Sequence, residues 1–223
     1  MAQPALEKET SQSTRERLLE AALDTFGQHG YDAATTRMIA GEAGVNVAAI
    51  PYYYNGKEGL YLAVIEHIVA IISNQMAAIH LAASQLDTAK PHCREEARSL
   101  LKRFFHRLVT FLIGTPQALR VARIIFREQL FPSTAYDTLY SGCMGAMIDT
   151  LARLLMVISQ TSTERTAKIR AITMLGQVLI FRIARETAVR SLAVKGYSVE
   201  EVDEIHQVIQ EHIDSILTGL DHH

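Results

Sequence analysis

The chain of 223 residues carries 22 Lys and Arg against 24 Asp and Glu, a net charge of −2 with histidine neutral. This balance excludes a globally basic coat for nucleic acid, although a local basic patch remains open. Apolar residues make up 48% of the chain, enough for a buried core in one large domain or two unequal ones. The two cysteines form neither a disulfide framework nor a Cys-x-x-Cys pair, which favours a reducing compartment.

The N-terminal segment up to Arg17 is polar and charged, so we expect no signal peptide. The most apolar run, residues 62–72, is interrupted by Glu66 and His67 and is shorter than the roughly 20 residues that cross a bilayer. We therefore expect a cytoplasmic protein without a membrane span.

Glycine and proline number only 12 and 5, which favours long helices. We expect a disordered arm over residues 1–12, followed by a first helix that starts at the capping box of residues 13–16. Helical periodicity continues to the end and predicts about nine helices and no strand, an all-α fold. One helix is expected from about Thr134 to Ile158. A second capping box at residues 161–164 opens a long helix that ends near Gly196, and a third at residues 198–201 opens the last helix. Residues 13–60 form a small N-terminal domain in this prediction, and residues 61–223 form a larger one.

A helix-turn-helix pattern follows the first predicted helix. Either hydroxyl of Thr35-Thr36 can cap a short helix, and Gly44 permits the sharp turn after it. Asn46 can cap the next helix, with Val45 and Ile50 in the two positions of a hydrophobic staple. Because any helical bundle contains short capped helices, these residues alone leave DNA binding and plain bundle packing both open.

Four segments in this region share their order and spacing with one family: residues 35–40 (TTRMIA), 43–46 (AGVN), 52–54 (YYY) and 57–60 (KEGL). The chain resembles the TetR/AcrR family of transcriptional regulators over residues 14–61. Residues 176–190 and 196–198 are similar to the CecR-type C-terminal domain of one branch. The resemblance implies an all-α homodimer that binds a palindromic operator in double-stranded DNA and is released from it by a small molecule.

The resemblance also assigns roles to residues. Thr36 matches a position that binds phosphate, Arg37 one that can read guanine, and Lys57 a phosphate-contacting lysine. The alternatives are that Thr36 only caps a helix and that the two cations only solvate a surface. The candidate DNA-binding residues are Thr36, Arg37, Asn46, Val47, Ala48, Ala49, Pro51, Tyr52, Tyr53 and Lys57.

Two features depart from this pattern. Pro51 lies about five residues into the predicted recognition helix, where proline costs ~3 kcal/mol in a regular helix. The helix is therefore kinked or tightened there, or the cost is offset by presenting Tyr52 and Tyr53 to DNA. Acidic residues also outnumber basic ones over residues 13–60, so we expect modest affinity and a shallow salt dependence. The small side chains of residues 47–49 can touch thymine methyl groups.

Aromatic and methionine residues of the middle helices are candidates for an effector pocket, although most aromatics at helical spacing are core. Charges on the apolar run 121–131 either are solvated, pair with one another, or hold a polar ligand group. The candidate ligand-binding residues are Phe105, Arg123, Phe126, Arg127, Phe131, Tyr140 and Met144. The CecR-type resemblance implies a hydrophobic effector and control of a transporter or efflux gene.

Two apolar stripes near the C-terminus have the spacing of a self-associating helix pair, and the family resemblance favours a dimer interface. The alternative is that both stripes are intramolecular core. The candidate interface residues are Met174, Val178, Ile205, Ile209, Ile213 and Ile216.

Two other functional classes are alternatives to a DNA-binding regulator. An enzyme is disfavoured because the chain has no Gly-x-Gly-x-x-Gly, P-loop, Gly-x-Ser-x-Gly or His-Glu-x-x-His motif, and we expect no metal or cofactor. The second is a helical adaptor or ligand-binding protein without DNA binding, which predicts that Arg37→Ala is tolerated.

Overall fold

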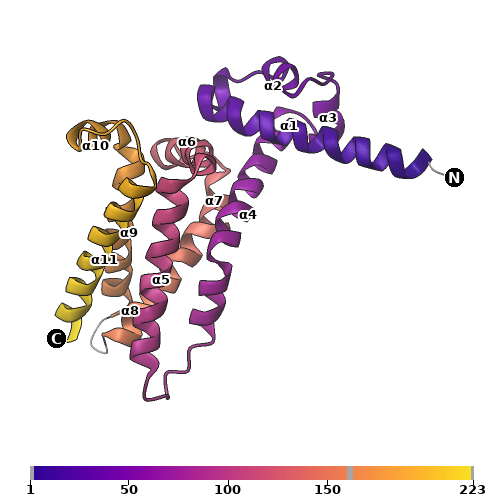
Figure 1. Ribbon diagram of the computed structural model, residues 1–223. Helices are drawn as coiled ribbons and strands as arrows, with labels where there is room; N and C mark the ends of the chain where they lie inside the picture. Colours follow the sequence, from indigo (N-terminus) through magenta and orange to yellow (C-terminus); the bar gives the residue numbers. More distant parts are fainter. Residues whose placement is uncertain (1–2, 160–162, 222–223) are drawn as a thin grey trace. The chain divides into compact units, whose positions relative to one another are not determined.

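The computed structural model describes residues 3–159 and 163–221, and within these residues every regular element is helical (Figure 1). The all-α prediction is therefore confirmed. The chain divides into two compact units. The N-terminal unit comprises the chain up to Ala70 together with Arg120–Leu139, and the C-terminal unit comprises Ile71–Leu119 and the chain from Tyr140 onward. The division falls inside helix α4 (Lys57–Ser84) and not at residue 60, because one long helix serves both cores.

The N-terminal unit contains α1 (Gln3–Ala33), α2 (Thr36–Ala43), α3 (Ala49–Tyr54), the first half of α4, most of α6 (Pro116–Leu130), and α7 (Tyr136–Leu139). Helix α1 begins ten residues before the predicted capping box at Ser13, so the structure describes the predicted arm as helix from residue 3 onward. Alanine, leucine, glutamate and lysine in this stretch favour helix, and Pro4 falls in the first turn, where proline is tolerated.

Helix α6 is tied to the N-terminal unit by polar contacts. Arg120 reaches α1, with Nε 2.6 Å from Oδ1 of Asp24 and one terminal nitrogen 2.8 Å from Oε2 of Glu20. Tyr61 of α4 donates its hydroxyl to Oε1 of the buried Glu128 at 2.6 Å, and burial together with this carboxylate raises the tyrosine pKa. The polar groups of α6 that interrupt its apolar pattern therefore hold helices together.

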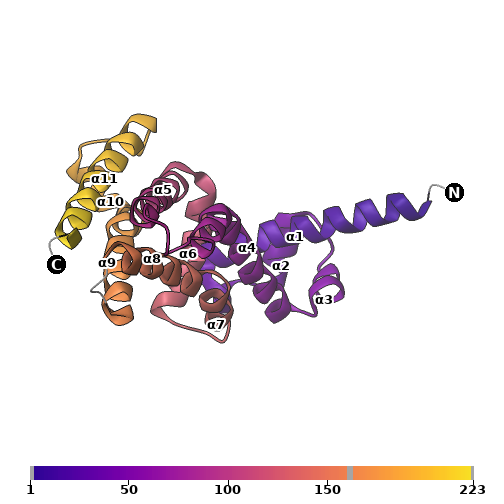
Figure 2. The ribbon, with the colours of Figure 1, turned by 90° about the horizontal axis from the view of Figure 1, so that it is seen from below.

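The C-terminal unit is a bundle of α5 (Cys93–Gly114), α8 (Gly145–Ile158), α9 (Glu164–Ile183) and α11 (Val199–Asp221). These four helices lie side by side in both views (Figures 1 and 2), with short α10 (Arg185–Ser191) between α9 and α11 in the chain. A continuous apolar core fills the bundle and includes Phe104, Phe105, Leu151, Leu155, Met174, Val178 and Ile209.

Two predicted long helices are interrupted in this unit. The helix expected from about Thr134 to Ile158 is divided into α7, a π-helical turn η1 (Tyr140–Met144), and α8. The helix expected up to Gly196 breaks at Ala184 between α9 and α10, where neither glycine nor proline marks the site. Hydrophobic periodicity cannot detect such breaks, because the residues on both sides keep their helical spacing.

Two capping predictions bear on the same helices. Glu201 Oε2 accepts the backbone N–H of Ser198 at 2.7 Å, which confirms the capping box that opens α11. At α9, Thr163 caps the helix by accepting the N–H of Thr166 at 3.2 Å, whereas residues 161 and 162 lie outside the described residues.

In the described chain, α4 and the stretch Tyr136–Ile158 are long and apolar enough to cross a membrane by length and composition alone. The sequence-based expectation that no segment reaches this length is therefore wrong. The first of these helices is apolar on several sides because Leu60, Val64 and Ile68 enter one core and Met76 and Ile79 enter the other.

Candidate nucleic-acid interface

Helix α2 begins with a side-chain cap. Thr35 is extended and its hydroxyl accepts the N–H of Met38 at 3.2 Å, so the structure selects Thr35 over Thr36 as the cap. Thr36 is the first residue of α2 and is half-buried, and Arg37, which follows it, is exposed. With Thr35 as the cap, Thr36 and Arg37 are the first two residues of the helix.

The turn between α2 and α3 is held from both sides. Gly44 adopts the left-handed conformation with φ of 62°, and its N–H returns to the carbonyl of Gly41 at 3.1 Å. Arg17 of α1 donates to the carbonyls of Ala43 and Gly44, the latter at 3.2 Å. The left-handed conformation favours glycine, and a Cβ at Gly44 would lie 2.8 Å from this guanidinium and displace it from the turn.

The entry to α3 explains how Pro51 is accommodated. Asn46 Oδ1 accepts the N–H of Ala48 at 2.9 Å, as a cap does. The next bonds are tightened to three residues, from Ala49 to Asn46 at 3.0 Å and from Ile50 to Val47 at 3.2 Å. Pro51 therefore lies in the first turn, where its missing N–H is not needed, because the Val47 carbonyl already accepts a bond. Of the alternatives drawn from the sequence, the tightened helix is the one observed.

Helix α3 has a buried side and an exposed side. Ile50 and Tyr54 are buried, and Val45, the other member of the predicted staple, is half-buried. The exposed side carries Tyr52, which is 79% exposed, and Val47, which is 42% exposed. Asn46, Ala48 and Pro51 are also exposed, whereas Ala49 and Tyr53 are half-buried. All ten predicted DNA-binding residues thus fall in α2, the turn that follows it, α3 and the start of α4.

The corner between α3 and α4 is set by backbone conformation. Asn55 ends α3 in the left-handed region with φ of 57°, and Gly56 follows with φ of 109°. A Cβ at Gly59 would overlap the carbonyl oxygen of Tyr54, so α4 can approach the end of α3 this closely only with glycine there. In the sequence, Gly59 stands out only as part of the segment 57–60, and nothing in its spacing reveals that a side chain there would meet the Tyr54 carbonyl.

Lys57 is positioned at the beginning of α4. Its Nζ donates to the carbonyl of Asp32 at 3.3 Å and lies 4.5 Å from the centre of the Tyr31 ring. Two other basic residues have structural tasks, since Arg17 holds the turn and Arg15 lies 5.6 Å from the Tyr54 ring. Within the part of the chain that the structure describes, Arg37 has no such task, so it is the cation most available to a ligand of this surface.

The predicted effector residues are divided between the two units. Arg123, Phe126, Arg127 and Phe131 belong to the N-terminal unit, and Phe131 is 76% exposed. The remaining three belong to the C-terminal unit: Phe105 is fully buried in its core, and Tyr140 and Met144 lie in the π-helical turn. Periodicity identifies an apolar face but not the unit that it joins, and the role of these residues in effector binding stays a prediction.

The predicted dimer residues lie in the core of the C-terminal unit, which is the alternative left open by the sequence. Met174, Val178, Ile205, Ile209 and Ile213 are buried, and Ile216 packs partly buried against them. Helix α9 instead presents a different apolar row, in which each side chain is more than half exposed: Ile169, Ile172, Ile180 and Ile183.

A cavity of about 330 Å³ lies within the C-terminal unit, between the second half of α4, α5, η1 and α8. Its walls are mainly apolar, with Ile72, Met76, Phe104 and Met147 among them. The polar groups at this cavity are Ser73, His80, Ser84, Cys143 and Thr150. Ser73, His80 and Ser84 lie about two turns and one turn apart on α4, which places them on one side of that helix, but Asn74 and Gln75 are polar too, so the sequence does not single out this set.

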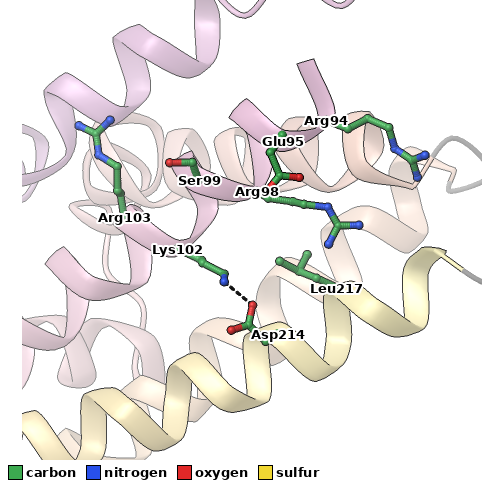
Figure 3. A pocket seen from close by; sticks show the side chains of 8 residues that line it. All are labelled: Arg94, Glu95, Arg98, Ser99, Lys102, Arg103, Asp214 and Leu217. Atoms are coloured by element: carbon green, nitrogen blue, oxygen red, sulfur yellow. Dashed lines mark ion pairs between the residues drawn. The ribbon is translucent and has the colours of Figure 1, made fainter. Parts of the chain in front are cut away.

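A second hollow of about 740 Å³ lies between α5 and α11 and is basic (Figure 3). Arg94, Arg98 and Lys102 follow one another along α5, and Lys102 pairs with Asp214 of α11. Arg94 donates to the carbonyl of Ile158 at the end of α8, with Nε at 3.1 Å. At least two of these cations therefore join helices, which is a structural role.

The N-terminal unit has the features of a helix-turn-helix: a short capped helix, a glycine turn and a stapled second helix with an exposed face. The chain also contains a separate helical unit with a cavity. Together these define the class of helix-turn-helix regulators with a regulatory domain. Residues 18–64 match the family of bacterial regulatory proteins called the tetR family, and residues 97–220 match the C-terminal domain of the HTH-type transcriptional dual regulator CecR. The chain belongs to the TetR family of transcriptional regulators, in the group that has this C-terminal, ligand-binding domain. The predicted family resemblance is thereby confirmed.

Relatives and solved structures agree with this assignment. The chain is 32% identical to the HTH-type transcriptional dual regulator CecR of Shigella flexneri over 210 residues, 94% of this chain and 93% of the relative. It resembles a TetR-like transcriptional regulator from Rhodococcus sp. RHA1, with a TM-score of 0.60 and 19% identity, covering 92% of this chain and 96% of the other. It also resembles AibR in complex with isovaleryl coenzyme A and operator DNA, with a TM-score of 0.64 and 14% identity, covering 88% and 95%. These relatives are regulators and not enzymes, and homodimers and repressors are typical of the family.

Proposed function

We propose that this protein is a ligand-responsive repressor that binds a palindromic operator as a homodimer and leaves the DNA when a small hydrophobic effector binds its C-terminal unit. The observation that carries the proposal is the exposed side of α3, held at a fixed angle by the Asn46 cap and the Val45–Ile50 staple. Such a helix can enter a major groove, and a dimer places two of them about 34–36 Å apart.

The residues of this surface suit a division of roles. Thr36 and Lys57, each at a helix start, are suited to phosphate, and the planar guanidinium of Arg37 suits the O6 and N7 acceptors of guanine. Val47 and Ala48 cannot make paired hydrogen bonds, but they can contact thymine methyl groups and allow close approach. Tyr52 supplies an exposed hydroxyl and ring beside them.

We call α2, α3 and the start of α4 the reading surface. Helix α4 can transmit effector binding to this surface, because it starts there at Lys57 and its second half lines the cavity. An effector that favours a different orientation of α4 changes the distance between the α3 helices of the two protomers and so weakens operator binding. It can do so only as far as its affinities for the two states differ.

The family supports further expectations. We propose a cytoplasmic location, no enzymatic activity and no membrane span for α4 or α8, since the relatives are DNA-binding regulators. A transporter or efflux gene is the proposed target. The isovaleryl coenzyme A of AibR is not carried over, because a polyanionic ligand of that size does not suit an apolar cavity of about 330 Å³.

Footprinting on DNA from upstream of the protein's own gene, at low ionic strength, tests the proposal. We expect a protected symmetric sequence, and Arg37→Ala should weaken it by about 1–3 kcal/mol by removing a base contact. Arg165→Ala, an exposed arginine of α9, is the matched control and should leave protection unchanged. Absence of any protected symmetric sequence with the wild-type protein would overturn the proposal.

A further inference from the structure

The cavity of the C-terminal unit presents a defined hydrogen-bonding group. Thr150 is buried, and its hydroxyl lies 2.7 Å from the carbonyl oxygen of Ala146 and 2.7 Å from Nδ1 of His80. The hydroxyl has one proton, which it donates to the carbonyl, so it accepts from His80 and Nδ1 must carry the hydrogen. In the neutral imidazole, Nε2 is then an acceptor. His80 is itself exposed and lines the open side of the cavity, so a ligand can reach this nitrogen from there.

The cavity also lacks the partners that a charged ligand needs. Among the described residues that line it, none is Asp, Glu, Lys or Arg. Cys143 stays a neutral thiol, since burial raises its pKa to about 11. A carboxylate or a phosphate seated against these walls would lose part of its hydration and gain no cation in return, which disfavours a charged ligand.

The size of the cavity limits the ligand further. A volume of about 330 Å³ equals that of about eleven liquid water molecules, which corresponds to a compact molecule of about ten to fifteen non-hydrogen atoms. The apolar walls given by Met76, Phe104 and Met147 suit a flat or aliphatic body.

The cavity adjoins a contact that a ligand can disturb. The Ser73 hydroxyl of α4 donates to the carbonyl of Gly142 at 3.2 Å, and Gly142 lies in η1, where the helix is widened to a π turn. Such turns are frequent at functional sites because they leave carbonyls turned out of the regular ladder. A molecule bound between these segments can therefore disturb the hydrogen bond that joins α4 to η1.

We propose that this cavity binds an uncharged, mainly apolar molecule of about ten to fifteen non-hydrogen atoms, with one hydrogen-bond donor for Nε2 of His80. The inference rests on the proposed function, of which it specifies the effector class. It selects against carboxylates, phosphates and larger conjugates of coenzyme A, and it places the recognition on α4 and α8.

Three small molecules of similar shape, chosen close to the lower size limit so that they fit the cavity, test the chemistry of this class on the full-length protein. Indole is uncharged and has one N–H donor, benzofuran lacks the donor, and indole-2-carboxylate adds an anionic group. Because the chain contains no tryptophan, the fluorescence of indole reports its binding directly, and benzofuran is measured by competition. We expect saturable binding of indole, about three- to tenfold weaker binding of benzofuran, and no competition by the carboxylate.

Substitutions locate the binding. Ala77→Phe and Ala146→Leu, made separately, add volume to the cavity from opposite walls and should each abolish indole binding, with unchanged circular dichroism as a fold check. Thr150→Val releases the orientation of His80 and should reduce the preference for indole over benzofuran. Ser99→Val, in the basic hollow between α5 and α11, should change nothing.

The outcomes separate the two proposals. Indole binding that survives both filling variants, or carboxylate binding as tight as that of indole, would overturn this inference. Absence of indole binding in a protein that still protects its operator overturns the effector class alone. Absence of operator protection with intact indole binding overturns the proposed function and leaves the ligand class of the cavity standing.

Discussion

The N-terminal reading surface and the C-terminal bundle are both helical, but they are held in different ways. The reading surface depends on single backbone positions, such as Gly44 and Gly59, and on side chains that cap or brace turns, such as Thr35 and Arg17. The bundle depends on a large continuous apolar core. A surface built on turns is sensitive to one atom at one position, whereas a packed core responds in proportion to the volume removed.

The largest effect is expected from Gly59→Val, which tests whether one position fixes the reading surface. Its Cβ would overlap the Tyr54 carbonyl, so α3 must move away from α4, and operator affinity should fall by more than about a hundredfold, or ~3 kcal/mol. Gly219→Ala, at an exposed site in α11 with open space around it, is the control. Titration of operator DNA measures both, and equal affinities would contradict the role given to the corner.

Phe105→Ala tests the other side of the comparison, at a residue that the sequence marks as a candidate ligand contact. The ring is fully buried in the bundle core, so the free energy of unfolding should fall by about 3–5 kcal/mol. Phe131→Ala, at an exposed ring in the segment after α6, should change it by less than about 0.5 kcal/mol. Denaturant titration measures the free energy of unfolding of both variants. Similar losses would contradict the assignment of Phe105 to the core and of Phe131 to the surface.

Ile172→Glu sharpens the comparison at the surface of the bundle. Homodimers are typical of the family, and five of the six predicted interface residues are buried within the chain, whereas the row on α9 is exposed. We therefore predict that a second copy covers the exposed row of α9. A charge there should weaken dimerisation by at least about tenfold, or ~1.4 kcal/mol, as measured by analytical ultracentrifugation. Glu164→Gln, at the exposed start of the same helix, is the control. An unchanged dimer would place the interface elsewhere.

The smallest effect concerns pH and the contact between α5 and α11. Nδ1 of His106 lies 2.8 Å from Nε2 of His206, and the pKa of His206 is lowered by burial and then by His106, against an opposing influence of Asp203. The unfolded chain therefore binds this proton more readily than the folded one, and stability should decrease as the pH falls below about 6.5. The melting temperature of His206→Gln should show less of this decrease, whereas exposed His212→Gln should follow the wild type.

Much of the reading surface could be predicted because its signals are local. The Asn46 cap, the Gly44 turn and the Val45–Ile50 staple each involve residues within five positions of one another, so their spacing is visible in the chain. The effect of Pro51 could not be predicted in the same way. Its energetic cost depends on where the helix begins, and only the tightened first turn seen in the structure shows that Pro51 lies within that turn.

The C-terminal unit was harder to predict because its function depends on which apolar faces meet. The buried Met174 and the exposed Ile172 lie on the same helix, two residues apart, and periodicity marks both as apolar. The cavity likewise brings His80 of α4 to Thr150 of α8, seventy residues apart. No spacing in the sequence specifies that pairing.

The sequence by itself determined the helical class, the family and the helix-turn-helix, since these follow from local propensity, capping and motif order. The tertiary structure alone decided where α4 divides between two cores, which apolar stripe is buried, and which polar side chains face one cavity. The physical reason is that hydrophobic burial is non-directional, so many packings satisfy the same periodic pattern until all helices are placed together.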